Sequence, residues 1–285
     1  MKLGDIAGRF TTSVKSIVKM VLQSRRVSVG VAEDADRPLV IMGNGPSLAD
    51  AIREESDVLR GFPSMAVNFA ANAPEFAGLR PEYYILADPH FFVKADDVNV
   101  RRLMDNLSAV DWSMRLFVPS AYAGKLPSDV RTNGHIKVEC FNAVGVEGWH
   151  WLENMAYSSG YGMPRPRNVL IPAIMVGLLM GYKRIYIAGA DHSWTRTLSV
   201  NERNEVVSVQ PHFYKEDERE IKRVTTDYLN YPLHSILYSF YVAFKSYHTI
   251  RRYADSRGVA VYNSTPDSFI DALERRQLAS LRAEL

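Results

Sequence analysis

Short hydrophobic runs alternate along the chain with longer amphipathic stretches. The short runs begin at Pro38, Met65, Glu82, Arg115, Ile136, Arg184 and Val259. Their length and the turn residues that follow them are typical of buried strands. Residues 168–181 and 233–257 instead carry apolar side chains at helical spacing, and a closing helix is expected over 268–285. This alternation predicts an α/β fold with a Rossmann-like, doubly wound and mainly parallel sheet.

Residues 1–30 have the pattern of an amphipathic helix. Its apolar positions recur at three- and four-residue steps: Leu3, Ile6, Phe10, Val14, Ile17, Val18, Val21 and Leu22. The basic residues along it face one acidic residue, Asp5. Such a helix is able to lie on an anionic membrane surface, to cover its own domain, or to join a second copy in a homo-oligomer. These alternatives remain open at the level of the sequence.

The remaining chain divides into a linker, one domain and an irregular excursion. Residues 31–37 are mostly polar and are expected to form the linker. Residues 38–285 then form the Rossmann-like domain. Within it, residues 195–232 are polar and poorly periodic, which predicts a lid over a site rather than part of the sheet.

Composition excludes several classes of protein. The 285 residues are 47% hydrophobic and 23% charged, which is ordinary for a globular protein, and the formal charge of +2 gives no reason to expect nucleic acid as a partner. A single cysteine, Cys140, excludes an internal disulfide and a four-cysteine zinc site. We expect no membrane span and no secretory signal, and therefore a cytoplasmic protein.

Polar residues follow several of the predicted strands, where parallel sheets bind ligands. These tips are Gly43-Asn44-Gly45, Asp88-Pro89, Gly189-Ala190-Asp191-His192 and Asn263-Ser264. The turn from Gly43 to Ser47 opens a helix, so its backbone amides are expected to favour a phosphate. Asp191 is suited to orienting a base, binding a hydroxyl, holding Mg²⁺ or capping a helix. No spacing of carboxylates and histidines demands a metal, and none is expected.

The segments at 40–48 and 181–191 give the chain a family resemblance. Val-Ile-Met-Gly-Asn-Gly-Pro-Ser-Leu resembles the nucleotide loop of the bacterial sialyltransferases of glycosyltransferase family 42, and Gly-Tyr-Lys-Arg-Ile-Tyr-Ile-Ala-Gly-Ala-Asp is similar to their later helix–strand unit. Both also resemble the broader MptE-like group, which includes a pterin pyrophosphokinase and the Maf-type flagellin glycosyltransferases. The resemblance covers 38–92 and 168–270.

The resemblance implies roles for individual residues. The turn at Gly43, Asn44, Gly45, Pro46 and Ser47 would hold the CMP part of an activated donor. Asn68 and Asp191 would also line the donor site. His192, Asn263 and Ser264 are expected at the same rim from their position at strand ends and not from the resemblance, and the alternative for 263–266 is a turn that leads into a capped helix. Asp88 stands where the family has an amide, and Asn168 is the nearest polar residue to the family's Arg-x-x-Ser-Gly. By analogy of role, His212 would be the catalytic base and Tyr214 or Lys215 would bind the departing phosphate, with His192 and His234 as competing bases.

These residues predict a glycosyltransferase that is inverting and independent of metal or cofactor. It would transfer an acidic sugar from a CMP-activated donor to a glycan or glycolipid acceptor, near the inner face of a membrane. The first alternative is an MptE-like pyrophosphokinase that uses ATP and Mg²⁺, held by Asp88 and Asp191. The second is a nucleotide-binding protein of the membrane surface without catalytic activity.

Overall fold

The computed structural model describes residues 3–208 and 231–285. Within them, eight strands form one sheet in the order β10-β9-β6-β1-β2-β3-β4-β5, and every neighbouring pair is parallel. The strands are β1 (Leu39–Met42), β2 (Ser64–Val67), β3 (Tyr83–Ile85), β4 (Met114–Pro119), β5 (Ile136–Phe141), β6 (Arg184–Ala188), β9 (Ala260–Asn263) and β10 (Glu274–Arg275). The predicted α/β fold with a Rossmann-like parallel sheet is confirmed.

The chain reverses its direction of travel across the sheet beside β1. From β1 it moves outward through β2, β3 and β4 to β5, and then returns to place β6 on the other side of β1. Met42 at the end of β1 pairs with Ala188 at the end of β6. The loops after these two strands therefore start side by side, at the switch point where α/β sheets bind their ligands.

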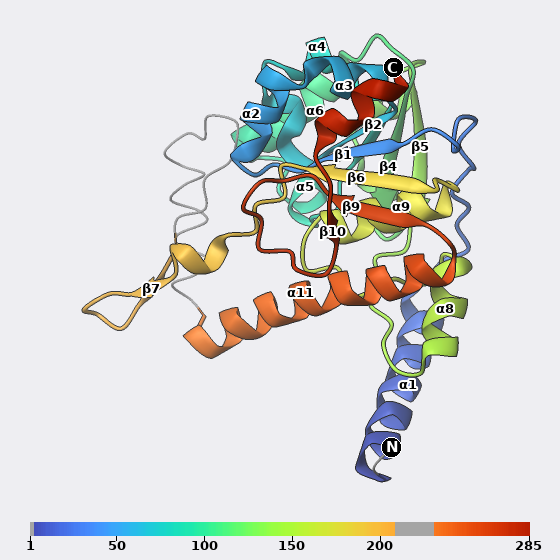
Figure 1. The fold of residues 1–285 in the computed structure, drawn as a ribbon, viewed down its shortest axis with the longest axis vertical. Coiled ribbons are helices and arrows are strands. Elements are labelled where there is room, and N and C mark those ends of the chain that lie inside the picture. The colour runs from blue at the N-terminus through green and yellow to red at the C-terminus, as the bar shows by residue number, and fades with distance from the viewer. Residues whose placement is uncertain (1–2, 209–230) are drawn as a thin grey trace.

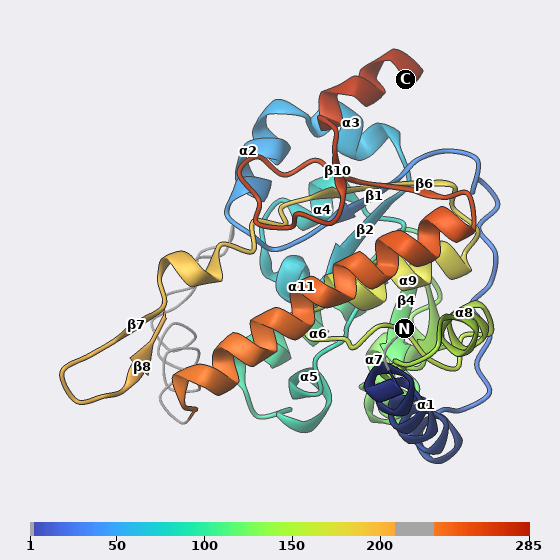
Figure 2. The same ribbon diagram turned by 60° about the horizontal axis from the view of Figure 1, so that its bottom comes forward.

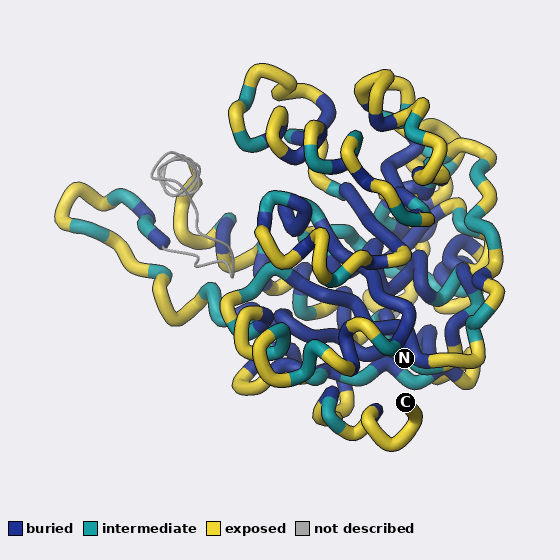
Figure 3. The backbone as a smooth tube through the Cα atoms, turned by 90° about the horizontal axis from the view of Figure 1, so that it is seen from above, coloured by how far each residue is buried: buried dark blue, intermediate teal, exposed yellow. Residues whose placement is uncertain are grey.

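Helices cover both faces of the sheet because successive strand side chains point to opposite sides (Figure 1). Leu39 and Ile41 pack with α8 (His150–Ser158), α9 (Leu170–Leu179) and α11 (Leu233–Ser256). Val40 and Met42 face the other layer. That layer contains α2 (Ser47–Glu54), α3 (Ser56–Gly61), α4 (Phe76–Leu79), α5 (His90–Val93), α6 (Val98–Ser108) and α7 (Ser128–Thr132). Figure 3 shows the result: buried stretches of the backbone lie in the interior of the molecule, and exposed stretches lie mostly at its periphery.

Helix α9 is the buried helix that the sequence predicts over 168–181. Most of its residues are inaccessible to solvent. Pro172 lies in its first turn, where a missing backbone N–H costs no intrahelical hydrogen bond. The apolar sequence of this helix follows from its place between the sheet and α11, which leaves it no solvent-facing side.

Two predicted helices differ from the structure. Helix α1 (Leu3–Gln23) ends before residue 30. Figure 1 shows it projecting from the body of the molecule, and Figure 2 views it nearly end-on. The helix expected over 268–285 is wrong: β10 and a 3₁₀ helix, η4 (Leu278–Glu284), take its place. Leu278 and Leu281 are both buried and three residues apart, a spacing that puts them on one side of a 3₁₀ helix.

The described part of the 195–232 excursion contains a short 3₁₀ helix, η3 (Trp194–Arg196), and a hairpin of β7 (Ser199–Val200) and β8 (Val206–Val207). These two strands form a small antiparallel sheet of their own. Two further 3₁₀ turns, η1 (Asn68–Asn72) and η2 (Ala123–Lys125), follow β2 and β4. Among the described helices, none is both long and apolar enough to cross a bilayer.

Candidate functional site

Two adjoining cavities lie at the carboxyl ends of the central strands. The larger has a volume of about 720 Å³ and the smaller about 300 Å³. Asn68, Asn168 and Val169 line both of them. The smaller cavity lies at the switch point, between the loops that follow β1 and β6, whereas the larger extends toward β4 and β5. Together they form the candidate site.

The turn after β1 is fastened to the loop after β6 through its backbone. The Gly43 amide donates to the Ala188 carbonyl at 2.8 Å, and the Gly45 amide donates to the Gly189 carbonyl at 2.9 Å. A Cβ atom at Gly43 would lie 2.4 Å from the Gly189 oxygen, so only glycine permits this approach. The expectation that the amides of Gly43 and Gly45 are open to a phosphate is therefore wrong, because both already have acceptors.

Asp191 lies against the same turn. Ser47 Oγ donates a hydrogen bond of 2.7 Å to Asp191 Oδ2, and a Cβ atom at Gly45 would lie 2.0 Å from that oxygen. The carboxylate thus sits beside the first residue of α2, where the helix dipole favours a negative charge. A donor phosphate at this point would meet a like charge. Asp191 is better suited to accepting hydrogen bonds from ribose or sugar hydroxyls.

Two asparagines join the ends of the central strands. Asn44 Nδ2 donates to the Val67 carbonyl at 3.2 Å, and Asn68 Oδ1 accepts from the Ala87 amide at 3.4 Å. Asn68 has a φ of +48°, a left-handed conformation that asparagine tolerates better than most residues. Both asparagines line the smaller cavity.

His192 and Asn168, which line the smaller cavity, are connected by a buried polar chain through Tyr247. His192 Nε2 lies 2.7 Å from Tyr247 Oη, and that hydroxyl donates to Asn168 Oδ1 at 3.2 Å. Asn168 Oδ1 also accepts from the Leu170 and Ile171 amides at the start of α9. Asn168 Nδ2 is buried and has no hydrogen-bond partner among the residues that the structure describes, so it can donate to a ligand.

The surroundings of His192 make it a poor base. Burial lowers the pKa of the imidazole to about 3 because the charged form loses its hydration. The same burial raises the pKa of the Tyr247 hydroxyl. Both groups are therefore neutral near pH 7, and His192 serves to hold the cavity wall.

The other predicted site residues lie in different places. Asp88 is exposed at the larger cavity, and Asp191 lines the smaller, so the two carboxylates do not share one cavity. Asn263 is buried away from both cavities, where its Oδ1 accepts from the Thr265 amide, and Ser264 likewise lines neither. His212, Tyr214 and Lys215 lie outside the described residues. Among the described residues, no cluster of His, Cys, Asp and Glu is suited to a metal ion.

The structure adds site residues that the sequence analysis missed. Trp194 stacks on His192 with ring centroids 4.2 Å apart, and it lines the smaller cavity together with Arg196. Arg25 and Arg167 line the larger cavity. Arg167 directly precedes Asn168, so its sequence position offered a signal. Arg25 offers none, because the sequence places it in the amphipathic helix expected over residues 1–30 and not at a strand end.

The sequence matches no protein-family model and no curated protein. The fold is similar to that of a solved structure, a Maf glycosyltransferase from Magnetospirillum magneticum AMB-1, with a TM-score of 0.51 and 15% sequence identity. That likeness covers 99% of this chain but only 40% of the Maf protein. At this level of identity the likeness concerns the fold. It agrees with the Maf part of the resemblance drawn from the sequence.

Proposed function

We propose that the protein is a glycosyltransferase that uses a CMP-activated acidic sugar. The observation that carries this proposal is the cleft at the switch point of a sheet whose fold is similar, over nearly the whole chain, to a Maf glycosyltransferase. Because the chain spans less than half of that protein, donor and acceptor are inferred from the residues of the cleft. The sialyltransferase-like turn at 43–47 supports the choice of CMP.

The donor would occupy the smaller cavity. Asp191 would accept hydrogen bonds from the hydroxyls of its ribose or sugar, and Asn168 would donate its unpaired Nδ2 hydrogen. Because the Gly43 and Gly45 amides are engaged, the phosphate needs cationic partners instead. Arg196, at the smaller cavity, is one such group. Lys215 is the second, proposed on the resemblance alone.

The acceptor would enter by the larger cavity, which contains Arg25 and Arg167. His212, proposed on the resemblance, would take the proton of the acceptor hydroxyl. The acceptor oxygen would then form a bond to the anomeric carbon as the bond from that carbon to the phosphate oxygen breaks, with inversion. CMP would leave with the bonding electron pair, stabilised by Tyr214 and Lys215.

Calorimetric titration of the protein with CMP, and separately with ATP plus Mg²⁺, tests the nucleotide class. We expect CMP to bind with the same affinity in the presence of a chelator. We also expect CMP release from a CMP-sialic acid donor that a chelator leaves unchanged. Binding of ATP with Mg²⁺ but not of CMP would refute the proposal in favour of a pyrophosphokinase.

The variant Asp191→Asn tests how the donor lies. We expect it to weaken CMP binding by about tenfold or more, since a hydrogen bond to a charged acceptor contributes about 1.5–3 kcal/mol. Asp111→Asn is the matched control, because Asp111 is exposed, pairs with Arg80, and lines neither cavity. Tighter binding by Asp191→Asn would instead mean that the carboxylate faces the phosphate, which contradicts the proposed arrangement.

A further inference from the structure

Helix α1 contacts the rest of the protein through a polar stripe, although its sequence is amphipathic. Ser13 and Ser16 are only 2% and 4% exposed, and they are its only fully buried residues among those described. Arg9, Thr12 and Met20 are half-buried beside them. These positions recur at the three- and four-residue steps of one helix face. The face of α1 that docks is therefore the one without a hydrophobic stripe.

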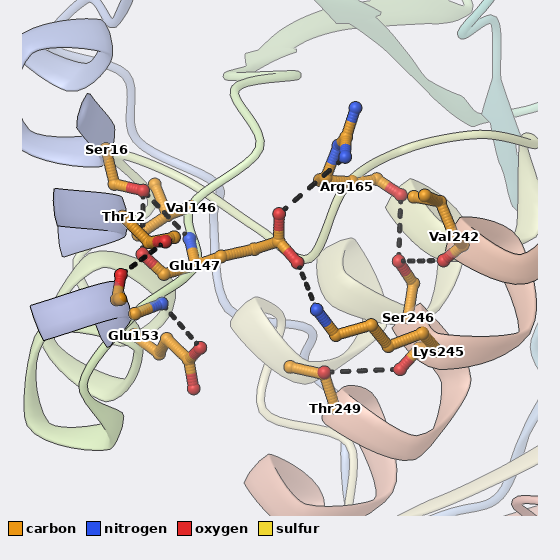
Figure 4. Close-up of polar contacts among 12 residues, drawn as sticks. Thr12, Ser16, Val146, Glu147, Glu153, Arg165, Val242, Lys245, Ser246 and Thr249 are labelled. Carbon is orange, nitrogen blue, oxygen red and sulfur yellow. Dashed lines mark hydrogen bonds and ion pairs between the residues drawn. The ribbon is translucent and has the colours of Figure 1, made fainter. Parts of the chain in front are cut away.

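Hydrogen bonds between the serines and a loop hold the helix in place, and Figure 4 shows those of Ser16. Ser16 Oγ donates to the Glu147 carbonyl at 2.7 Å and accepts from the Glu147 amide at 3.0 Å, while Ser13 Oγ accepts from the Trp149 amide at 3.0 Å. The Glu147 carboxylate is in turn bound by Lys245 of α11 at 2.8 Å. This docking fixes which way the opposite face of α1 points.

That opposite face is an exposed apolar stripe. It consists of Ile6, Phe10, Val14, Ile17, Val18, Val21 and Leu22. Val21 and Leu22 are 77% and 76% exposed, far more than is usual for large aliphatic side chains. The apolar stripe does not cover the core of its own domain. An exposed apolar surface of this length is typical of an interaction site.

Aromatic side chains extend the apolar stripe onto the neighbouring segment. The Phe10 and Trp149 rings lie 5.9 Å apart, and Trp149 stacks on Trp151 with centroids 6.4 Å apart. Trp151, in α8, is 61% exposed. Tryptophan is enriched where proteins meet the interface between lipid and water, because its ring is apolar and its N–H is polar.

The charges around the stripe identify its partner as an anionic surface. Lys15, Lys19, Arg25 and Arg26 are all exposed, against one acidic residue of α1, Asp5. Each basic residue near an anionic bilayer contributes favourably to binding. We propose that α1 lies flat on an anionic lipid bilayer, with its apolar stripe and Trp151 in the headgroup region. If a second copy of the protein docked on the same stripe, the cations of the two copies would lie close together and repel each other.

The proposal also locates the acceptor, and this part depends on the proposed function. Leu22, Gln23 and Arg25, at the end of α1, line the larger cavity. A bilayer under α1 would therefore lie next to the mouth of that cavity. The acceptor class that fits this arrangement is a saccharide carried on a membrane lipid, whose sugar enters the cavity while its lipid tail stays in the bilayer.

Binding to vesicles tests the membrane contact. We expect the full chain to sediment with phosphatidylglycerol-containing vesicles and much less with pure phosphatidylcholine vesicles. Val18→Glu should weaken binding by about tenfold, because it places a charge in the apolar stripe. Gly8→Glu is the matched control, since it adds the same charge to α1 at an exposed position with open space around it. Replacing Lys15 and Lys19 by Gln should cost about fivefold each on anionic vesicles.

Three outcomes would overturn the proposal. The first is that the protein sediments with neither kind of vesicle, and the second is that Val18→Glu and Gly8→Glu lose vesicle binding equally. The third is a stable dimer that does not bind vesicles and that Val18→Glu dissociates. Circular dichroism melts of each variant check that the fold is intact.

The acceptor is tested separately. Val18→Glu should lower transfer to a vesicle-borne acceptor but not to a soluble one. Failure of all transfer with intact vesicle binding would refute the proposed function alone.

Discussion

The contact between the turn after β1 and the loop after β6 predicts a large effect of adding one methyl group. In Gly45→Ala the new Cβ would lie 2.8 Å from the Gly189 carbonyl oxygen and 2.0 Å from Asp191 Oδ2. The Asp191 side chain is able to rotate away, but only by giving up its hydrogen bond from Ser47. The Gly189 oxygen belongs to the backbone directly after β6 and has much less freedom to move.

The cost follows from these two contacts. Overpacking against fixed atoms costs about 1–3 kcal/mol. Loss of a hydrogen bond to a charged group adds about 1.5 kcal/mol or more, less whatever water restores at the cavity. We therefore expect Gly45→Ala to lower the free energy of unfolding by about 2–4 kcal/mol. CMP binding should weaken at the same time, because Asp191 would no longer lie where the donor needs it.

Urea denaturation followed by tryptophan fluorescence measures the change in stability. Gly78→Ala is the control, because a Cβ there meets no atom within 4 Å and Gly78 lies in α4. It should be neutral or stabilising by up to about 1 kcal/mol, as alanine favours helix. If Gly45→Ala changes stability by less than about 0.5 kcal/mol, the two loops are not packed together as described.

Three further changes test the site and its supports. Below pH 6.5 the free energy of unfolding should fall by up to about 1.4 kcal/mol per pH unit, because His192 binds a proton in the unfolded chain but stays neutral in the folded one, where its pKa is about 3. His192→Gln should make the midpoint of urea denaturation less dependent on pH. Asn168→Ala should cost about 1–2 kcal/mol in the same assay by removing the cap of α9, and no loss would contradict that role. Ser16→Ala leaves the Glu147 amide without its acceptor, so limited proteolysis should release α1 faster than in the native chain, whereas the exposed Thr11→Ala should not.

Apart from β10, a charged edge strand that the sequence does not reveal, the sequence predicts the sheet well because its strands are short apolar runs with polar tips that are visible locally. It could not predict that the Gly43 and Gly45 amides are occupied. Their acceptors come from β6, and only the strand order places β6 beside β1. The left-handed conformation of His192, with a φ of +52°, likewise depends on tertiary packing.

Periodicity also has a limit at the two ends of the chain. In α1 it identifies the apolar face but cannot say which face docks, and the buried serines decide that question. At the carboxyl terminus, Leu278 and Leu281 are spaced for a 3₁₀ helix as well as for an α-helix. The choice there depends on packing: Leu278 and Leu281 belong to the same core cluster as Val58 and Leu59 of α3, far away in the sequence.

The position of Leu22 and Gln23 in the wall of the larger cavity has a practical consequence. A truncated version that starts at the linker, a common remedy for an exposed apolar amino terminus, would remove part of the wall of this cavity along with the apolar stripe. Loss of the proposed transfer in such a truncation would therefore say nothing about whether the protein acts at a membrane. Single substitutions in the apolar stripe leave that cavity wall in place, and they can separate the proposed membrane contact from the proposed transfer.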